Sequence, residues 1–324
     1  MMSAKNTGIF SWGVGVAIVA ITLLSLLSHI AWHPYLELTS HFKIQYFLIS
    51  LFGLIVILLL RSKRWVWIAL FCLAIQLIEI LPWYFPSSGS TTSTQSNLRI
   101  LLSNVYVRNQ NPDKLLNLIK SEQPNLVVIQ EKTPAWIEAI NSLKPQFPHF
   151  FQAPEDIAIF SRIPLENPTI FGGENSSSIG LTLTIAGQKI AVVATHPLPP
   201  KPDLTEFRNA ELDWVTNYIN QQNNPVILVG DLNTTMWSPY YKQLEDKTGL
   251  KNARQGFGIL PTWPAPTPYA STHPFLAFFK PLLFIPIDHY LVSPEIQVRS
   301  LRPGSNIDSD HLPLIADLLI QPVK

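Results

Sequence analysis

The sequence predicts an α/β domain that follows three transmembrane helices. Charge is distributed unevenly: residues 1–96 contain seven charged residues, whereas the rest of the 324-residue chain holds 18 Lys and Arg and 20 Asp and Glu, a net charge of −2. Beyond residue 98, short β-rich runs alternate with segments of helical periodicity. These patterns predict a membrane domain over residues 1–85, a Ser/Thr-rich linker over 86–97 and one globular domain over 98–324.

Three apolar runs predict the membrane-spanning helices, at about residues 9–32, 44–60 and 65–85. A helix needs about 20 apolar residues to cross a bilayer. The first run contains no Asp, Glu, Lys or Arg, and it is too long for a signal peptide and lacks a small-residue cleavage site. Aromatic residues at the ends of the third run are typical of a membrane interface.

The basic sequence "RSKR", residues 61–64, lies between the second and third runs and predicts the orientation. Because positively charged loops remain in the cytoplasm, we expect a cytoplasmic N-terminus and a globular domain on the periplasmic or extracellular side of the cytoplasmic membrane. The single cysteine, Cys72, excludes an intrachain disulfide and a cysteine-rich zinc site. A single cysteine is compatible with both oxidising and reducing compartments, so it does not indicate on which side of a membrane the domain lies.

Strands and helices alternate along the globular part. Helices are expected over residues 111–123, 133–147 and 205–221, the first two with a proline placed to start a helix. Strands are expected over residues 98–107, 125–131, 157–162, 179–185, 189–196, 225–231, 287–293 and 311–320.

Polar residues able to bind metal or transfer protons stand at the ends of several expected strands. One such residue would carry little weight, but a set of them indicates strand ends that converge on a cleft. The set comprises Asn104, Glu131, His196, Asp231 with Asn233, Asp288, and Asp310 with His311.

The residue types suggest the chemistry. Carboxylates and amides without thiolates suit a hard cation such as Mg²⁺ or Mn²⁺. Histidines that titrate near neutrality suit general acid–base catalysis. The sequence has no GxxxxGK[ST] or GxGxxG motif, which disfavours nucleotide-cradling folds. The combination points to metal-assisted hydrolysis, above all of a phosphoester.

Eight short motifs occur in an order that resembles the endonuclease/exonuclease/phosphatase superfamily, which includes DNase I-like enzymes. They are "LSNVYV", "VVIQE", "IAIFSRIP", "ATHPLPP", "GDLNTT", "PTWP", "IDHYLVS" and "SDHLPLIADL", and they cover residues 98–320. The apolar front is similar to that of bacterial membrane-anchored members. The resemblance implies a four-layer sandwich of two mixed β-sheets flanked by helices, and a magnesium-dependent hydrolase acting on ester bonds.

The resemblance also implies a metal site. Asn104 and Glu131 resemble the metal-binding pair, with Glu131 the principal ligand, and Asp310 lies at the same metal. Taken alone, Asn104 reads more simply as an amide at a strand edge.

Catalytic roles follow from the same motifs. His311 resembles the base that takes a proton from water or the group that steadies a phosphoryl oxygen, and Asp288 would orient it, although Asp288 alone could be a turn carboxylate. Asp231 and Asn233 resemble the pair that positions water and phosphate, and His196 a candidate acid for the leaving oxygen.

The other histidines are expected to be structural or peripheral. Strand alternation directs His289 away from Asp288. His149 and His273 lack motif context, and an interfacial role is the default for three histidines near the ends of the apolar runs, namely His29, His33 and His41.

The substrate is left open between a nucleic acid and a phospholipid or inositol phosphate. The net charge of −2 on residues 98–324 is poor for non-specific duplex binding. No counterpart exists for the phosphate-contacting Tyr of apurinic endonucleases, since only Tyr218, in an expected helix, lies between Glu131 and Asp231. The Phe-rich run over 275–284 is either a buried strand with its approach loop or a segment that lines the substrate entrance and contacts lipid.

Two other kinds of function, a binding module and a transporter, would also combine membrane helices with this chain. A catalytically silent, membrane-anchored binding module would share the fold, but such a descendant need not keep the whole polar set. Three spans without a paired repeat are few for a transport pathway.

Overall fold

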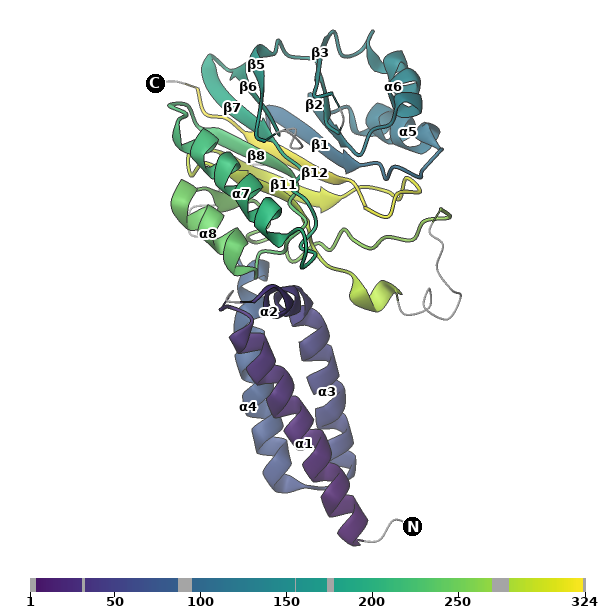
Figure 1. Cartoon of the computed structure of the whole chain (residues 1–324), viewed down its shortest axis with the longest axis vertical. Coiled ribbons are helices and arrows are strands. Elements are labelled where there is room, and N and C mark those ends of the chain that lie inside the picture. The colour runs from purple at the N-terminus through teal and green to yellow at the C-terminus, as the bar shows by residue number, and fades with distance from the viewer. Residues whose placement is uncertain are drawn as a thin grey trace.

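Two parts are stacked along the long axis of the molecule, a helix bundle and a sheet-containing domain (Figure 1). The computed structural model describes residues 4–30, 33–86, 95–154, 156–173, 178–269 and 280–322. Most of the expected linker, residues 87–94, therefore lies outside the described residues.

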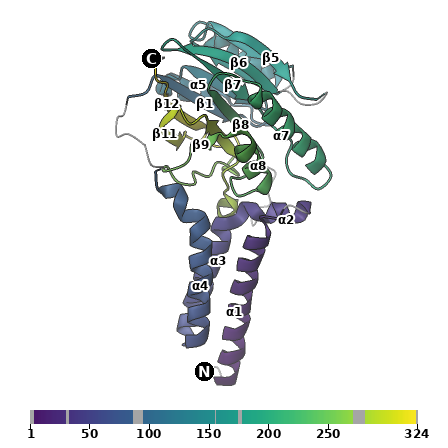
Figure 2. The ribbon, with the colours of Figure 1, turned by 90° about the vertical axis from the view of Figure 1, so that its left-hand side faces the viewer.

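Within the described residues, three helical segments of the bundle are long and apolar enough to cross a membrane, namely Thr7–Leu27, Pro34–Leu59 and Lys63–Tyr84. Their main helices are α1 (Ala4–Leu27), α3 (Lys43–Leu59) and α4 (Lys63–Ile80). The short helix α2 (Pro34–Thr39) and the turn η1 (Ser40–Phe42) lie across the end of the bundle nearest the sheets, and η2 (Leu81–Tyr84) continues α4 at that end (Figure 2). A small residue allows close packing inside the bundle: a Cβ atom at Gly53 would lie 2.9 Å from Ile18 Cδ1, so a larger residue there would require Ile18 to shift.

Twelve named strands form two six-stranded sheets. The first sheet has the order β11-β12-β1-β2-β4-β3, and the second has the order β5-β6-β7-β8-β10-β9. The strands of the first sheet are β1 (Leu98–Asn104), β2 (Leu126–Gln130), β3 (His149–Gln152), β4 (Ala158–Ser161), β11 (Gln297–Pro303) and β12 (Leu314–Leu319). Those of the second are β5 (Glu166–Phe171), β6 (Ser178–Ile185), β7 (Gln188–Ala194), β8 (Val226–Asp231), β9 (Lys251–Asn252) and β10 (Asp288–Val292).

Strand alternation builds the layers. In β1, Ile100 and Leu102 enter the core between the two sheets, whereas Leu101 faces the opposite side and packs under helices. The outer face of the first sheet is covered by α5 (Pro112–Glu122) and α6 (Pro134–Ile140, followed by η3, Asn141–Leu143). The outer face of the second sheet is covered by α7 (Thr205–Asn220) and α8 (Pro239–Thr248). The predicted four-layer sandwich is confirmed.

Several elements escaped the sequence patterns. Strands β3, β5, β9 and β11 and helix α8 were not expected, and these four strands are the edge strands of the two sheets, with short or polar sequences. The first predicted strand also ends earlier than expected, at Asn104, because residues 105–108 turn away from the sheet.

The sheet domain packs directly on the end of the bundle. Ile80 of α4 belongs to the same apolar cluster as residues of α7 and α8, and Ile44, Phe47 and Trp83 pack against that cluster. The hydrophobic core beneath the second sheet is therefore shared between the two parts of the chain.

Candidate active site

The topology brings polar ends of both sheets to one edge. Parallel pairing of β1 with β2 places Asn104 opposite Gln130, so Glu131 follows directly beside it. Antiparallel pairing of β8 with β10 places Asp231 opposite Asp288. Asp310 and His311 precede β12, which is antiparallel to β1, so they lie beside the end of β1. Packing of the two sheets then brings the polar side chains of both sheet edges together.

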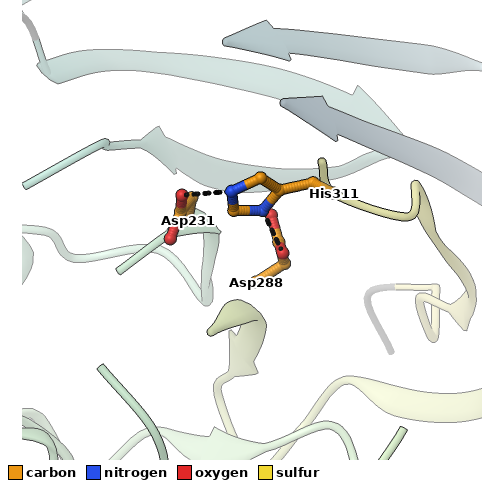
Figure 3. Close-up of side chains that lie close together, drawn as sticks. All are labelled: Asp231, Asp288 and His311. Atoms are coloured by element: carbon orange, nitrogen blue, oxygen red, sulfur yellow. Dashed lines mark hydrogen bonds and ion pairs between the residues drawn. The ribbon is translucent and has the colours of Figure 1, made fainter. Parts of the chain in front are cut away.

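His311 lies between two buried carboxylates, as Figure 3 shows. Its Nδ1 donates to Asp288 Oδ2 at 2.9 Å, and its Nε2 lies 3.5 Å from Asp231 Oδ2. Burial by itself lowers the pKa of His311, but the charges of Asp288 and Asp231 outweigh it and raise the pKa to about 10. The expected pairing of His311 with Asp288 is thus present in the geometry.

Asp231 is the centre of the arrangement. Its Oδ2 lies 3.4 Å from His196 Nε2 and accepts from Asn104 Nδ2 at 3.2 Å, while its Oδ1 accepts from the backbone of Asn233 at 2.8 Å. Burial opposes ionisation, but the charge of His311 and the hydrogen bond from His196 lower the pKa of Asp231 to about 2. Asp231 is therefore a fixed anion between two imidazoles.

His196 has its own carboxylate partner, Asp156, which sequence reasoning missed. His196 Nδ1 lies 2.8 Å from Asp156 Oδ2, and Asp156 Oδ1 accepts from the backbone of Glu131 at 2.7 Å. Burial opposes both charges, yet their mutual attraction raises the pKa of His196 and lowers that of Asp156. One signal could have revealed Asp156, since it stands just before a strand in "DIAIF", much as Asp288 opens "DHYLVS".

Glu131 and Asp310 form the acidic side of the site. Glu131 accepts from Asn104 Nδ2 at 2.9 Å and from the backbone of Val107 at 3.0 Å. Asp310 Oδ2 accepts from Trp263 Nε1 at 3.3 Å, whereas Oδ1 is buried without a hydrogen-bond partner among the described residues. Burial raises the pKa of Asp310. The charge of His311 lowers this pKa, whereas the charge of Glu131 raises it, because the carboxylates of Asp310 and Glu131 repel each other.

This donor set fits a divalent cation. A hard metal ion would compensate a buried carboxylate oxygen that has no hydrogen-bond partner and lies beside a second carboxylate. Asn104 uses Oδ1 to accept from the backbone of Tyr106 at 3.0 Å, which leaves that oxygen one further lone pair for a ligand. Asp231, Asp288 and His311 also have ligand atoms within 4.8 Å of one another, but they already bond to each other. Glu131 with Asp310 therefore fits a cation better.

The remaining histidines take varied places. His289 is buried, accepts from Arg254 and donates to the carbonyl of Thr234 at 2.8 Å, so it supports the loop after β8. His41, expected at the membrane interface, is instead buried against Thr235 in the same loop. His149 is half-buried in β3, and His273 lies outside the described residues.

The Phe-rich run is only partly described. Phe275, Phe278 and Phe279 lie outside the described residues, whereas Phe284 follows the short turn η4 (Lys280–Leu283). The carbonyls of Leu282 and Phe284 accept from Gln45 in the first turn of α3 at 3.0 and 3.3 Å.

Fold and site together define a class: hydrolases of phosphoester bonds built as four-layer α/β sandwiches with carboxylates and histidines at one sheet edge. The chain belongs to the Endonuclease/Exonuclease/phosphatase family, whose profile matches residues 101–311. No curated protein matches the sequence.

Solved structures share the fold at low sequence identity. A family member from Bacteroides vulgatus has a TM-score of 0.56 at 15% identity, covering 70% of this chain and all (100%) of that one. The D. rerio TDP2 complexed with single-strand DNA product has a TM-score of 0.55 at 17% identity, covering 68% of this chain and 98% of that one. The human Nocturnin catalytic domain with bound sulfate has a TM-score of 0.51 at 19% identity, covering 69% and 94%.

Proposed function

We propose that this protein is a membrane-anchored phosphoesterase that depends on a divalent metal and hydrolyses a phosphodiester or phosphomonoester. The observation that carries the proposal is the placement of Asp231 between two histidines, each backed by its own carboxylate, beside the Glu131–Asp310 pair. Family membership supports phosphoester hydrolysis as the reaction class.

Glu131 and Asp310 would hold Mg²⁺ or Mn²⁺, with Asn104 as a third ligand or as the residue that orients Glu131. When bound, the ion supplies positive charge that polarises the phosphoryl group. Its presence would also relieve the repulsion between the two carboxylates.

His311 and Asp288 act as a dyad at the phosphoryl group. Asp288 fixes the ring through Nδ1, so Nε2 carries or accepts the proton on the side of Asp231. With a proton on Nε2, His311 donates to a phosphoryl oxygen; without it, the same atom accepts a proton from water. The adjacent carboxylates favour the protonated form.

His196 and Asp156 form a second dyad on the other side of Asp231. His196 would donate its Nε2 proton to the leaving oxygen, and the carboxylate of Asp156 would favour the protonated form of the ring. Asp231, as a fixed anion, aligns both rings and orients a water with Asn233. In-line displacement at phosphorus needs one group that accepts a proton from the attacking water and one that donates a proton to the leaving oxygen.

Two substrate classes share this chemistry. A nucleic acid is one candidate, because the D. rerio TDP2 structure holds a single-strand DNA product. A phospholipid is the second, favoured by exposed Leu282 and Leu283 beside the first turn of α3, six residues or fewer from Asp288. Helix α3 continues from there for about 22 Å to Leu59, less than the roughly 30 Å of a bilayer core, so in a membrane-anchored protein the two leucines would lie at or below the lipid interface.

The N-terminal helices would anchor the protein in the cytoplasmic membrane, with the catalytic domain on the periplasmic or extracellular side. The basic residues Arg61, Lys63 and Arg64 between α3 and α4 support this orientation, because they favour the cytoplasmic side.

The test is a substrate panel applied to the full-length protein in lipid nanodiscs with Mg²⁺. The panel contains single-stranded and duplex DNA, a phosphatidylinositol phosphate, sphingomyelin, a soluble inositol phosphate and bis(4-nitrophenyl) phosphate. We expect hydrolysis of at least one substrate, lost in Asp231→Asn and retained in Asp308→Asn, which makes the same change in a carboxylate that pairs with Lys114 outside the site. Binding without hydrolysis of any substrate would favour the silent-module alternative.

A further inference from the structure

The loop between β8 and α8, residues 231–238, connects the active site to the helix bundle. It begins with Asp231 and Asn233 in the site and ends at Ser238, whose side chain caps α8. The residues between have no helix or strand structure of their own. The position of this catalytic loop therefore depends on contacts from other elements.

Helix α2 and turn η1 of the N-terminal part supply such contacts. Ser238 Oγ donates to Glu37 Oε1 at 2.9 Å. His41 Nδ1 lies 3.1 Å from Thr235 Oγ1 and accepts from the Thr235 backbone at 3.4 Å. These four side chains are each at most 4% exposed, so water does not compete for the hydrogen bonds.

Glu37 also forms a fully buried ion pair with Arg208 of α7. One turn further along α7, Glu211 accepts from the backbone of Leu198 at 2.7 Å. The neighbouring carbonyl of Pro197 accepts from Asn233 Nδ2 at 2.9 Å. Glu37 of α2 is thus linked both to the catalytic loop and, through α7, to the segment that carries His196.

Further contacts fix the orientation of the two parts of the chain. Trp237 Nε1, in the catalytic loop, donates to the carbonyl of Glu79 at the end of α4 at 2.9 Å. The backbone N–H groups of Gly256 and Gly258 donate to the carbonyl of Trp83 at 3.0 and 2.9 Å. Both glycines have positive φ, and a Cβ atom at either would come within 3.0 Å of residues 84–86, so the approach requires glycine.

We propose that α2 and η1 are positioning elements of the active site: His41 and Glu37 hold the catalytic loop so that Asp231 and Asn233 face the two histidine dyads. The catalytic part of this inference rests on the proposed function. The structural part, that the end of the bundle nearest the sheets fixes residues 233–238, does not depend on the proposed function.

His41 is the better residue to test. Removing either partner of the buried Glu37–Arg208 pair would leave an uncompensated charge and would destabilise the whole fold. His41→Leu removes the acceptor with little change in volume, whereas His41→Asn retains an acceptor at the position of Nδ1. Tyr35→Ala, which changes an exposed residue of the neighbouring helix α2, serves as the matched control.

The experiment compares these variants as full-length proteins in nanodiscs by two measurements. Hydrogen–deuterium exchange reports the loop directly: we expect amides of 233–238 to exchange about fivefold or more faster in His41→Leu, with β8 and β10 unchanged. Kinetics on bis(4-nitrophenyl) phosphate report positioning: we expect kcat to fall about tenfold or more with KM within about twofold. His41→Asn should recover most of both properties, and Tyr35→Ala should match wild type in both.

Each outcome decides a separate point. Unchanged loop exchange in His41→Leu would overturn the inference, whether or not the protein is active. Faster exchange with unchanged kcat would overturn the positioning role. A wild-type protein inactive on every phosphoester would refute the proposed function, while the exchange data would still decide whether the bundle holds the loop.

Discussion

Replacing Asp288 by Asn and His311 by Ala, singly and together, tests whether the two side chains work as one unit. The hydrogen bond of 2.9 Å between them is buried. In the proposed chemistry, the only role of Asp288 is to fix the imidazole ring of His311 and to favour its protonated form. Asp288→Asn keeps the shape but removes the charge, and His311→Ala removes the proton-transferring group itself.

The expected magnitudes follow from the loss of one acid–base group. Such a group contributes about 10²–10⁴ in rate, so a central expectation for each single variant is a loss of roughly 10³, or about 4 kcal/mol of barrier. If the residues act independently, the double variant should lose roughly 10⁶. If they act as a dyad, it should lose little more than the worse single variant.

The assay is kcat/KM for bis(4-nitrophenyl) phosphate, or for whichever panel substrate is hydrolysed, with full-length protein in nanodiscs at fixed Mg²⁺. Asp308→Asn, in the loop before His311, is the control and should keep wild-type activity. Melting temperatures of all variants identify any that fail to fold. Losses that multiply in the double variant would refute the dyad.

Three further predictions concern the metal, the orientation and the pH dependence of stability. EDTA should abolish hydrolysis and Mg²⁺ restore it, and Glu131→Gln should raise the Mg²⁺ concentration needed for half-maximal activity; hydrolysis that survives EDTA would contradict the metal assignment. Alkaline phosphatase fused after residue 97 should be active, because it forms its disulfides only outside the cytoplasm, and inactivity there with an active cytoplasmic reporter at the same junction would reverse the orientation. Burial raises the pKa of Glu245 in α8 from 4.5 to about 7, so folding favours its protonated form and stability should fall as pH rises between these values. Glu245→Gln should therefore raise the melting temperature more at pH 8 than at pH 4.5, and an equal effect at both would show that Glu245 is not the cause.

Sequence patterns predicted much of the local structure. Three long apolar runs predicted the three long helices, and alternating strands with proline-initiated helices predicted a mixed α/β domain, whose four layers the family resemblance implied. These features are local, because periodicity and length act within a single element. Edge strands such as β9, with two residues, carry too little pattern to be recognised.

Site residues were predicted where they stand at strand ends, since polar residues there interrupt an apolar run. Asp231, Asp288 and His311 do lie together in the structure. Asp156 was not predicted, because its partner His196 is 40 residues away and only the packing of the two sheets, with β4 in one and β7 in the other, brings them together.

By itself, the sequence determined which residues could perform chemistry and which segments could enter a membrane, because both depend on residue type and local order. Only the tertiary structure decided which side chains hydrogen-bond to one another and that Asp310 Oδ1 is buried without a hydrogen-bond partner among the described residues. It also decided that His41, 194 residues before Thr235, packs against the catalytic loop. Such long-range contacts depend on how layers and helices dock, and docking is set by the combined shape of many side chains, which no short pattern records.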